Sequence, residues 1–133
     1  MSIKQYEEQY RSRGFFWNQH LACLVEEYAG REIPYQHHKT NKAMTVRLLP
    51  PDSFVVGREY GPYAVTVKYL NEEISPVGDC NERYVQLFLT ESGKLIGFAD
   101  YLLLRWGGDE LDWRSSLALL LQGIAPAKIG VIQ

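Results

Sequence analysis

The sequence predicts an α+β protein in which two N-terminal helices precede short strands and a meander of strands that a C-terminal helix closes. Helical apolar periodicity occurs near both ends of the chain, whereas short β-favouring runs separated by turn residues occupy much of the middle. The chain has 133 residues, of which 46% are hydrophobic. This length and composition suit one domain spanning residues 1–133, because domains of about 100–150 residues bury a substantial core.

Two helices are expected at the N-terminal end. The first begins at Ser2, which heads a capping box, and ends at Gly14. The second begins after Asn18, whose side chain can accept hydrogen bonds from the first turn, and ends at Gly30. The aromatic run at residues 15–17 joins them. We expect it to plug the core between the helices, with a protein contact surface as the alternative.

The next part of the chain contains shorter elements. Residues 33–35 and 44–48 have the composition of strands. Residues 50–52 predict a rigid corner, and residues 54–56 predict another short strand. The stretch 61–71 fits a strand by its β-branched core and a helix by its apolar spacing, so the residues alone leave it open.

A meander of strands is expected after this stretch. A turn at residues 77–79 precedes strands at residues 84–89 and 94–99, which a hairpin loop containing Gly93 joins. A third strand follows at residues 101–106.

A helix closes the meander. It begins at a carboxylate cap, either Asp109 or Asp112, and ends before Gly123. Its apolar residues share one stripe, which comprises Trp113, Leu117, Leu120, Leu121 and Ile124. Because such a stripe must cover an apolar surface, we expect this helix to pack on the sheet.

Composition argues against several classes of protein. Fourteen basic and sixteen acidic residues give a net charge of −2, without the basic excess expected of a nucleic-acid binder. The N-terminal residues are polar and no apolar run approaches the length of a membrane span, so we expect a soluble, cytoplasmic protein. Cys23 and Cys80 lie far apart and predict neither a disulfide framework nor a zinc site.

The sequence contains no recognisable catalytic motif. His37 and His38 are adjacent and would face opposite sides of a strand, and His20 stands alone, so no metal-ligand spacing is present. Cys80 has no local signature of a nucleophile around it. Phosphate-binding and dinucleotide-binding glycine loops are also absent from the sequence. We therefore expect no metal, no cofactor and no enzymatic activity.

The charge is unevenly divided along the chain. Residues 69–133 carry nine acidic and five basic side chains, a net charge of −4, whereas residues 1–68 carry +2. An acidic surface suits a basic protein partner, because complementary potentials speed encounter and disfavour wrong partners. The alternative is an acidic surface that is simply solvated.

The order of features resembles the SUKH superfamily of immunity proteins, in particular its third subgroup. The resemblance begins at the glycine-aromatic step of residues 14–16 and continues to the helix end at residues 24–30, where Ala29 and Arg31 depart from the family pattern. Three further segments continue it: the apolar-x-Pro-x-Gly-acid run at residues 74–79, the strand, turn and strand at residues 85–98, and the closing helix at residues 111–123.

The resemblance implies an α+β fold with a central, mostly antiparallel sheet flanked by N-terminal helices and a C-terminal helix. It also makes residues 61–71 a helix. It also implies an immunity protein that binds and neutralises a cognate bacterial polymorphic toxin domain, often a nuclease or another nucleic-acid-modifying enzyme. A scaffolding or regulatory interaction domain without a toxin partner is the alternative. A small metal-dependent hydrolase using His20 or His37 is a second alternative.

We expect an acidic, partly aromatic face to cover the toxin in a one-to-one complex. The free protein is expected to be a monomer or a weak homodimer, because an exposed sheet edge can pair with a second copy. The candidate contact residues combine acids of the C-terminal half with two tyrosines: Glu72, Glu73, Glu82, Tyr84, Glu91, Asp100, Tyr101, Asp109 and Glu110.

Overall fold

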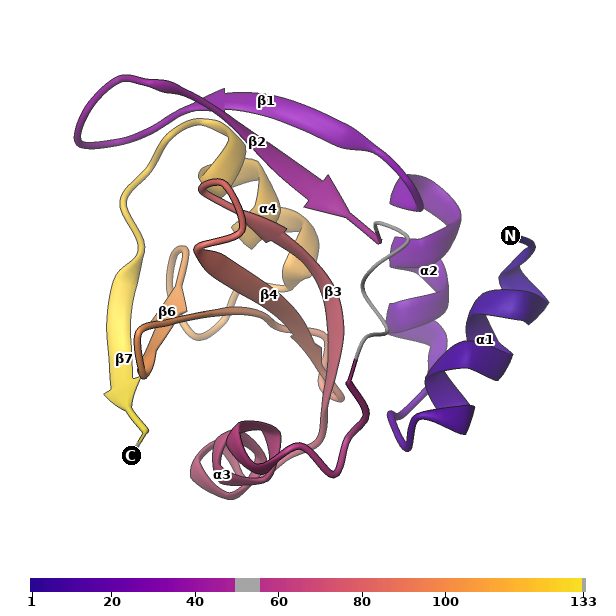
Figure 1. Cartoon of the computed structure of the whole chain (residues 1–133). Coiled ribbons are helices and arrows are strands. Elements are labelled where there is room, and N and C mark those ends of the chain that lie inside the picture. Colours follow the sequence, from indigo (N-terminus) through magenta and orange to yellow (C-terminus); the bar gives the residue numbers. More distant parts are fainter. Residues whose placement is uncertain (50–55, 133) are drawn as a thin grey trace.

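The computed structural model describes residues 1–49 and 56–132, and it confirms the α+β class (Figure 1). The predicted corner at residues 50–52 lies outside the described residues, and the predicted strand at residues 54–56 is described only at Val56, in a bend. The elements in chain order are α1 (Ile3–Ser12), α2 (Gln19–Tyr28), β1 (Glu32–Gln36), β2 (Ala43–Leu48), α3 (Gly61–Leu70), β3 (Ile74–Cys80), β4 (Val85–Thr90), β5 (Leu95–Ala99), β6 (Leu102–Arg105), α4 (Trp113–Leu121) and β7 (Ala127–Val131).

The strands of the described residues form one antiparallel sheet in which each strand pairs with the next along the chain, in the order β1 to β7. Cys80 pairs with Val85 across β3 and β4, and Gln86 pairs with Phe98 across β4 and β5. The β3–β4 and β5–β6 turns therefore lie at one end of the sheet. The β4–β5 turn lies at the other end.

Helices cover both faces of the central strand β4, because its successive side chains point to opposite faces. On one face, Tyr63 of α3 contacts Phe88 at 5.3 Å between ring centroids and accepts a hydrogen bond from Gln86 Nε2 at 2.9 Å. On the other face, Val85 and Leu120 of α4 line a common cavity. Figure 1 shows α4 beneath the β1–β2 hairpin.

Strand β3 runs through residues 77–79, so the turn predicted there is wrong. The register shifts between Pro76 and Gly78, which marks a β-bulge. A Cβ added at Gly78 would lie 2.1 Å from the Arg47 carbonyl oxygen of β2, so the glycine permits close strand approach. The Tyr10 hydroxyl donates to the Pro76 carbonyl oxygen at 2.5 Å and ties α1 to the bulge.

Side-chain caps mark the starts of α1, α2 and α4. Ser2 forms the capping box of α1, and the Asn18 side chain accepts from the Leu21 N–H at 3.1 Å to cap α2. Asp112, rather than Asp109, caps α4 by accepting from the Ser115 N–H at 3.0 Å. None of the helices in residues 1–49 and 56–132 is long and apolar enough to cross a membrane.

Residues 61–70 form a helix, as the family resemblance implies. Pro62 lies in its first turn, where a missing backbone donor costs nothing. Asn71 ends the helix in the left-handed conformation with φ 58°. The buried side chains Tyr63 and Thr66 lie on one face, so tertiary packing outweighs the β-branched residues of this segment.

The C-terminal region differs from the prediction in two respects. Strand β7 was not predicted, because its five residues include Gly130 and show no alternation of buried and exposed side chains. Ile124 was predicted on the buried stripe of α4, but 46% of it is exposed. The reason is that α4 ends at Leu121, so Ile124 lies beyond the helix and leaves its stripe.

Candidate functional site

The nine candidate contact residues do not form one surface, because strand register separates them between the two ends of the sheet. We call one end the glutamate end; it contains the β4–β5 turn and the segments beside it, with Glu72, Glu73, Glu91, Asp109 and Glu110. We call the other end the tyrosine end; it contains the β3–β4 and β5–β6 turns, with Glu82, Tyr84, Asp100 and Tyr101.

Carboxylates at the glutamate end bind their own protein. The Glu73 carboxylate accepts two hydrogen bonds from Arg58, at 2.7 Å from Nε and 3.1 Å from Nη2. The hydrogen bond to Glu73 is the main cause of the raised pKa of Arg58. Glu91 accepts from the backbone N–H of Glu73 at 2.8 Å, and Glu72 accepts from the Ser92 N–H at 2.9 Å. These three carboxylates hold neighbouring segments together.

The N-terminal ends of two helices meet the β4–β5 turn at the glutamate end. The Asn18 side chain, which caps α2, donates to the Glu91 carbonyl oxygen at 2.9 Å. The Trp113 N–H at the start of α4 donates to the Gly93 carbonyl oxygen at 2.8 Å. Because helix N-termini carry partial positive charge, acidic residues here are also favoured electrostatically. The glutamate end therefore connects α2 and α4 to the β4–β5 turn.

Asp109 and Glu110 belong to the loop between β6 and α4 at the same end. The Asp109 carboxylate forms an ion pair with Arg105 Nη1 at 3.1 Å, and its backbone carbonyl accepts a hydrogen bond from the Lys94 ammonium. Both acids are exposed. Asp109 therefore ties the loop to the β4–β5 turn, while Glu110 lies on the surface beside it.

The tyrosine end presents large side chains to solvent. Tyr84 is 62% exposed and Tyr101 is 59% exposed. Glu82 forms an ion pair with Lys42 at 3.1 Å, and both of these side chains are more than 60% exposed, so the pair contributes little to stability. Asp100 and Tyr101 form the two-residue turn between β5 and β6. These side chains are available to a partner.

The turns at this end adopt a backbone conformation that favours glycine, yet no glycine occupies them. Asn81, Glu82 and Arg83 have φ values of 53°, 57° and 73°, and Asp100 and Tyr101 have 51° and 63°. The left-handed region costs a side-chain-bearing residue about 1–2 kcal/mol, less for Asn and Asp. Strain retained in this way is concentrated at functional sites in proteins.

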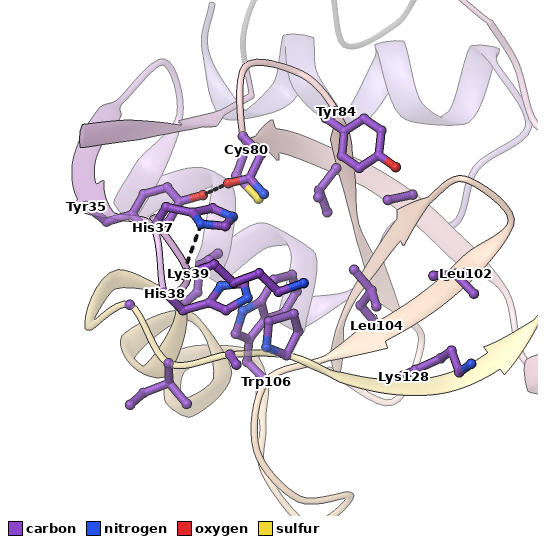
Figure 2. A pocket seen from close by; sticks show the side chains of 18 residues that line it. Tyr35, His37, His38, Lys39, Cys80, Tyr84, Leu102, Leu104, Trp106 and Lys128 are labelled. Atoms are coloured by element: carbon purple, nitrogen blue, oxygen red, sulfur yellow. Dashed lines mark hydrogen bonds between the residues drawn. The ribbon is translucent and has the colours of Figure 1, made fainter. Parts of the chain in front are cut away.

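A cavity of about 390 Å³ opens beside the tyrosine end (Figure 2). Its rim carries His37, His38 and Lys39 from the tip of the β1–β2 hairpin and Lys128 from β7. None of the described residues that line it is Asp or Glu. Most of its wall is apolar and comes from β4, β5, β6, α4 and the segment after α4: Val85, Ala99, Leu102, Leu104, Trp106, Leu120, Ile124 and Pro126.

The two histidines of the hairpin tip are stacked, with 4.4 Å between ring centroids. The expectation that they would face opposite sides applies to a strand, and both lie beyond β1, which ends at Gln36. His37 Nδ1 accepts from the backbone N–H of Lys39 at 3.2 Å, so neutral His37 carries its proton on Nε2. Burial is the main cause that lowers the pKa of His38, and electrostatic repulsion from His37 and Lys39 lowers it further.

Cys80 and Tyr35 form a buried polar group at the base of this cavity. Cys80 is 1% exposed, and burial is the main cause that raises the pKa of its thiol to about 12. The Tyr35 hydroxyl donates to the Asn81 side-chain oxygen, and burial raises its pKa as well. Because the thiolate is the nucleophilic form, the protonated Cys80 thiol is poorly suited to nucleophilic catalysis near neutral pH.

The described residues offer no metal centre. Within residues 1–49 and 56–132, no group of three or more His, Cys, Asp and Glu side chains is arranged to hold a metal ion. His20 lies at the start of α2 near Gly93, whereas His37 lies at the β1–β2 hairpin tip. The geometry therefore gives no support to a hydrolytic metal site that uses both histidines.

Comparison with known proteins finds no match for this chain. No protein-family model, curated protein or solved structure matches it. The function is therefore inferred from the residues and from the geometry of the two ends.

Of the described residues that line the cavity, only Tyr84 was among the candidate contact residues predicted from the sequence. Trp106 and Leu104 lie in a predicted strand, where cavity walls and core residues have the same composition. Lys128 lies in β7, which was not predicted. The basic run from His37 to Lys39 was the one sequence feature that pointed to a cationic site. It becomes part of a cavity only because the folded hairpin lies beside an apolar wall formed by other elements.

Proposed function

We propose that this chain is a non-catalytic, cytoplasmic immunity protein that binds and neutralises a cognate toxin domain, with the tyrosine end as its contact surface. The ordered resemblance to the SUKH superfamily supports the class of protein. The contact surface narrows from nine candidate residues to four, which are Glu82, Tyr84, Asp100 and Tyr101. The carboxylates of Glu72, Glu73 and Glu91 have structural roles instead.

The observation that carries this proposal is the strained backbone of the two tyrosine-end turns. Glu82, Arg83 and Tyr101 adopt left-handed φ values without the relief that glycine would provide. A sequence under pressure for stability alone would place glycine or asparagine at these positions. Retention of larger side chains in both turns supports a role for those side chains in recognition.

The exposed groups suit a basic protein partner. Tyr84 and Tyr101 supply large contact area at low conformational-entropy cost, as interface tyrosines commonly do. Glu82 and Asp100 add negative charge next to them. Nuclease active sites are often basic, so this surface would cover such a site, or hold the toxin in an inactive shape, through complementary charge.

The test is affinity capture with the tagged full chain from its own host, followed by binding measurements on what is captured. We expect a toxin domain in equimolar amount, whose activity is lost in the complex. The double variant Tyr84→Ser/Tyr101→Ser should weaken binding at least ~100-fold, because two hot-spot side chains are removed. The control Tyr60→Ser, at a tyrosine that is 48% exposed on another surface, should change affinity less than about twofold.

Two outcomes would overturn the proposal. Capture of no toxin domain, but of regulatory proteins or of the chain itself, would favour the scaffolding alternative. Capture of a toxin whose affinity is insensitive to Tyr84 and Tyr101 would move the contact surface elsewhere. Circular dichroism melting of each variant separates a binding defect from a folding defect.

A further inference from the structure

We propose that the cavity beside the tyrosine end is a binding site for a small amphipathic anion, an apolar molecule with one carboxylate-like or sulfonate-like head group. The volume of about 390 Å³ lies within the range of about 300–1,000 Å³ that is usual for small-molecule sites. This inference does not depend on a toxin partner, because it rests on the shape and charge of the cavity.

The wall of the cavity favours an apolar body in the ligand. Trp106 is 2% exposed, and Leu104 and Leu120 lie beside it in the same lining. Figure 2 shows Trp106 and Leu104 on the side of the cavity opposite the β3–β4 turn, where Cys80 and Tyr84 lie. An aliphatic or aromatic group in this space would bury apolar surface at about 25 cal/mol per Å².

The cavity exists because the β1–β2 hairpin reaches beyond the rest of the sheet. Only Arg47 and Leu48 of β2 pair with β3, so the first part of β2 continues past the β3–β4 turn together with β1. The Gln36 carbonyl oxygen at the end of β1 lies so close to Gly123 that an added Cβ there would be 2.6 Å away. The hairpin tip is thereby held over the C-terminal end of α4.

The rim favours a negative head group. Lys39 and Lys128 both line the cavity, and within the described residues neither forms an ion pair. Figure 2 shows the Lys39 side chain extended toward Trp106 and Leu104. By contrast, Lys42 of the same hairpin is paired with Glu82. The lysines of the cavity thus leave two positive charges uncompensated.

This local charge contrasts with the rest of the molecule. The chain carries a net charge of −2, and residues 69–133 carry −4, yet the described lining of the cavity contains no acid. The two lysine charges would repel a metal ion or an organic cation. They attract an anion, and the His37 Nε2–H adds a hydrogen-bond donor at the same rim.

The test compares three probes that share one chain and differ in head group: octanesulfonate, octanol and octyltrimethylammonium. Each is titrated into the ¹⁵N-labelled full chain, the two ionic probes below their micelle concentrations and octanol below its solubility limit. Octanesulfonate should cause saturable shifts at the amides of residues 37–39 and 123–125. It should bind at least ~10-fold more tightly than octanol, since charge-assisted contacts add to apolar burial. Octyltrimethylammonium should bind more weakly than octanol.

Matched variants locate the head group. Lys39→Gln/Lys128→Gln should weaken octanesulfonate binding ~10-fold and leave octanol binding unchanged, because it removes charge but not the apolar wall. Lys4→Gln/Lys68→Gln removes the same charge from exposed positions outside the cavity and should change neither affinity more than about twofold. All four lysines are exposed, so the variants should fold.

The proposal fails under any of three results. Equal binding of the three probes would show that the head group is not recognised. Shifts confined to other parts of the chain would place the binding elsewhere. Absence of saturable binding, with the melting curve unchanged, would show that the cavity takes no ligand of this class.

Discussion

At the glutamate end, the carboxylates of Glu72, Glu73 and Glu91 accept hydrogen bonds from the protein itself, whereas at the tyrosine end Glu82 forms an exposed pair with Lys42. All four residues are glutamates in or beside turns of the same meander. Their roles differ because Arg58 and the backbone N–H groups of Glu73 and Ser92 lie within hydrogen-bond distance at the glutamate end. Environment, rather than residue type, decides which acids stabilise the fold.

The turn backbones at the two ends show the same contrast. The β4–β5 turn places Gly93 at φ +91°, a value that glycine adopts without steric cost. The β3–β4 and β5–β6 turns place Glu82, Arg83 and Tyr101 at φ values of 57°, 73° and 63°. The β4–β5 turn thus has glycine at its left-handed position. The two turns of the tyrosine end have larger, exposed side chains at left-handed positions where glycine would be less strained.

The largest effect on stability should come from removing a carboxylate at the glutamate end. Glu73→Ala leaves the Arg58 guanidinium, whose side chain is 23% exposed, without its bidentate partner. We expect the free energy of unfolding to fall by about 2 kcal/mol. Glu82→Ala is the matched control and should change it by less than about 0.5 kcal/mol. Urea unfolding measures both, and equal losses would contradict the distinction between the ends.

A smaller effect should follow from exchanging glycine between the two kinds of turn. Glu82→Gly should raise the free energy of unfolding by about 0.5–1 kcal/mol, because it relieves left-handed strain. Gly93→Ala should lower it by about 1 kcal/mol, because the new Cβ is strained at φ +91° and would lie 2.8 Å from His20 Nδ1. Thermal and urea unfolding report both changes. A stability loss in Glu82→Gly would show that the tyrosine-end turns are not strained.

The smallest effect concerns the residue that caps α4. This helix contacts the glutamate end through the hydrogen bond from the Trp113 N–H to the Gly93 carbonyl oxygen. Asp112→Ala should cost about 0.5–1 kcal/mol near neutral pH. The hydrogen bond from the Ser115 N–H is the main cause that lowers the pKa of Asp112 below its ordinary value of 3.8. Because the folded-state pKa is the lower one, this contribution is present above the unfolded-state pKa and disappears as the pH falls through the folded-state pKa.

Unfolding of wild type and Asp112→Ala across pH checks this dependence. The difference between their free energies of unfolding should be constant near neutral pH and should shrink below about pH 4. A difference that stayed constant down to about pH 2 would show that the ionised carboxylate does not provide the cap.

Much of the fold was predictable because its signals are local. Ser2, Asn18 and Asp112 cap helices through bonds to residues three positions away, and such bonds can be read from short motifs. The strand through Gly78 was missed because a glycine and an acid after proline look like a turn, whereas the bulge depends on close approach of Arg47 in another strand. The candidate contact residues were predicted from their charge and their position in the sequence. Neither property specifies the strand register, which decides the end of the sheet at which each residue lies.

The sequence by itself determined the α+β class, the caps of α1 and α2, the order of the meander strands and the acids and tyrosines in or next to its turns. The tertiary structure decided which of those acids hold the fold together and where the cationic cavity opens. The physical reason is distance along the chain. Asn18 forms a hydrogen bond with Glu91 across 73 positions, and residues of the β1–β2 hairpin tip, α4 and β7 line the same cavity. These environments therefore arise only when distant segments pack together in the folded protein.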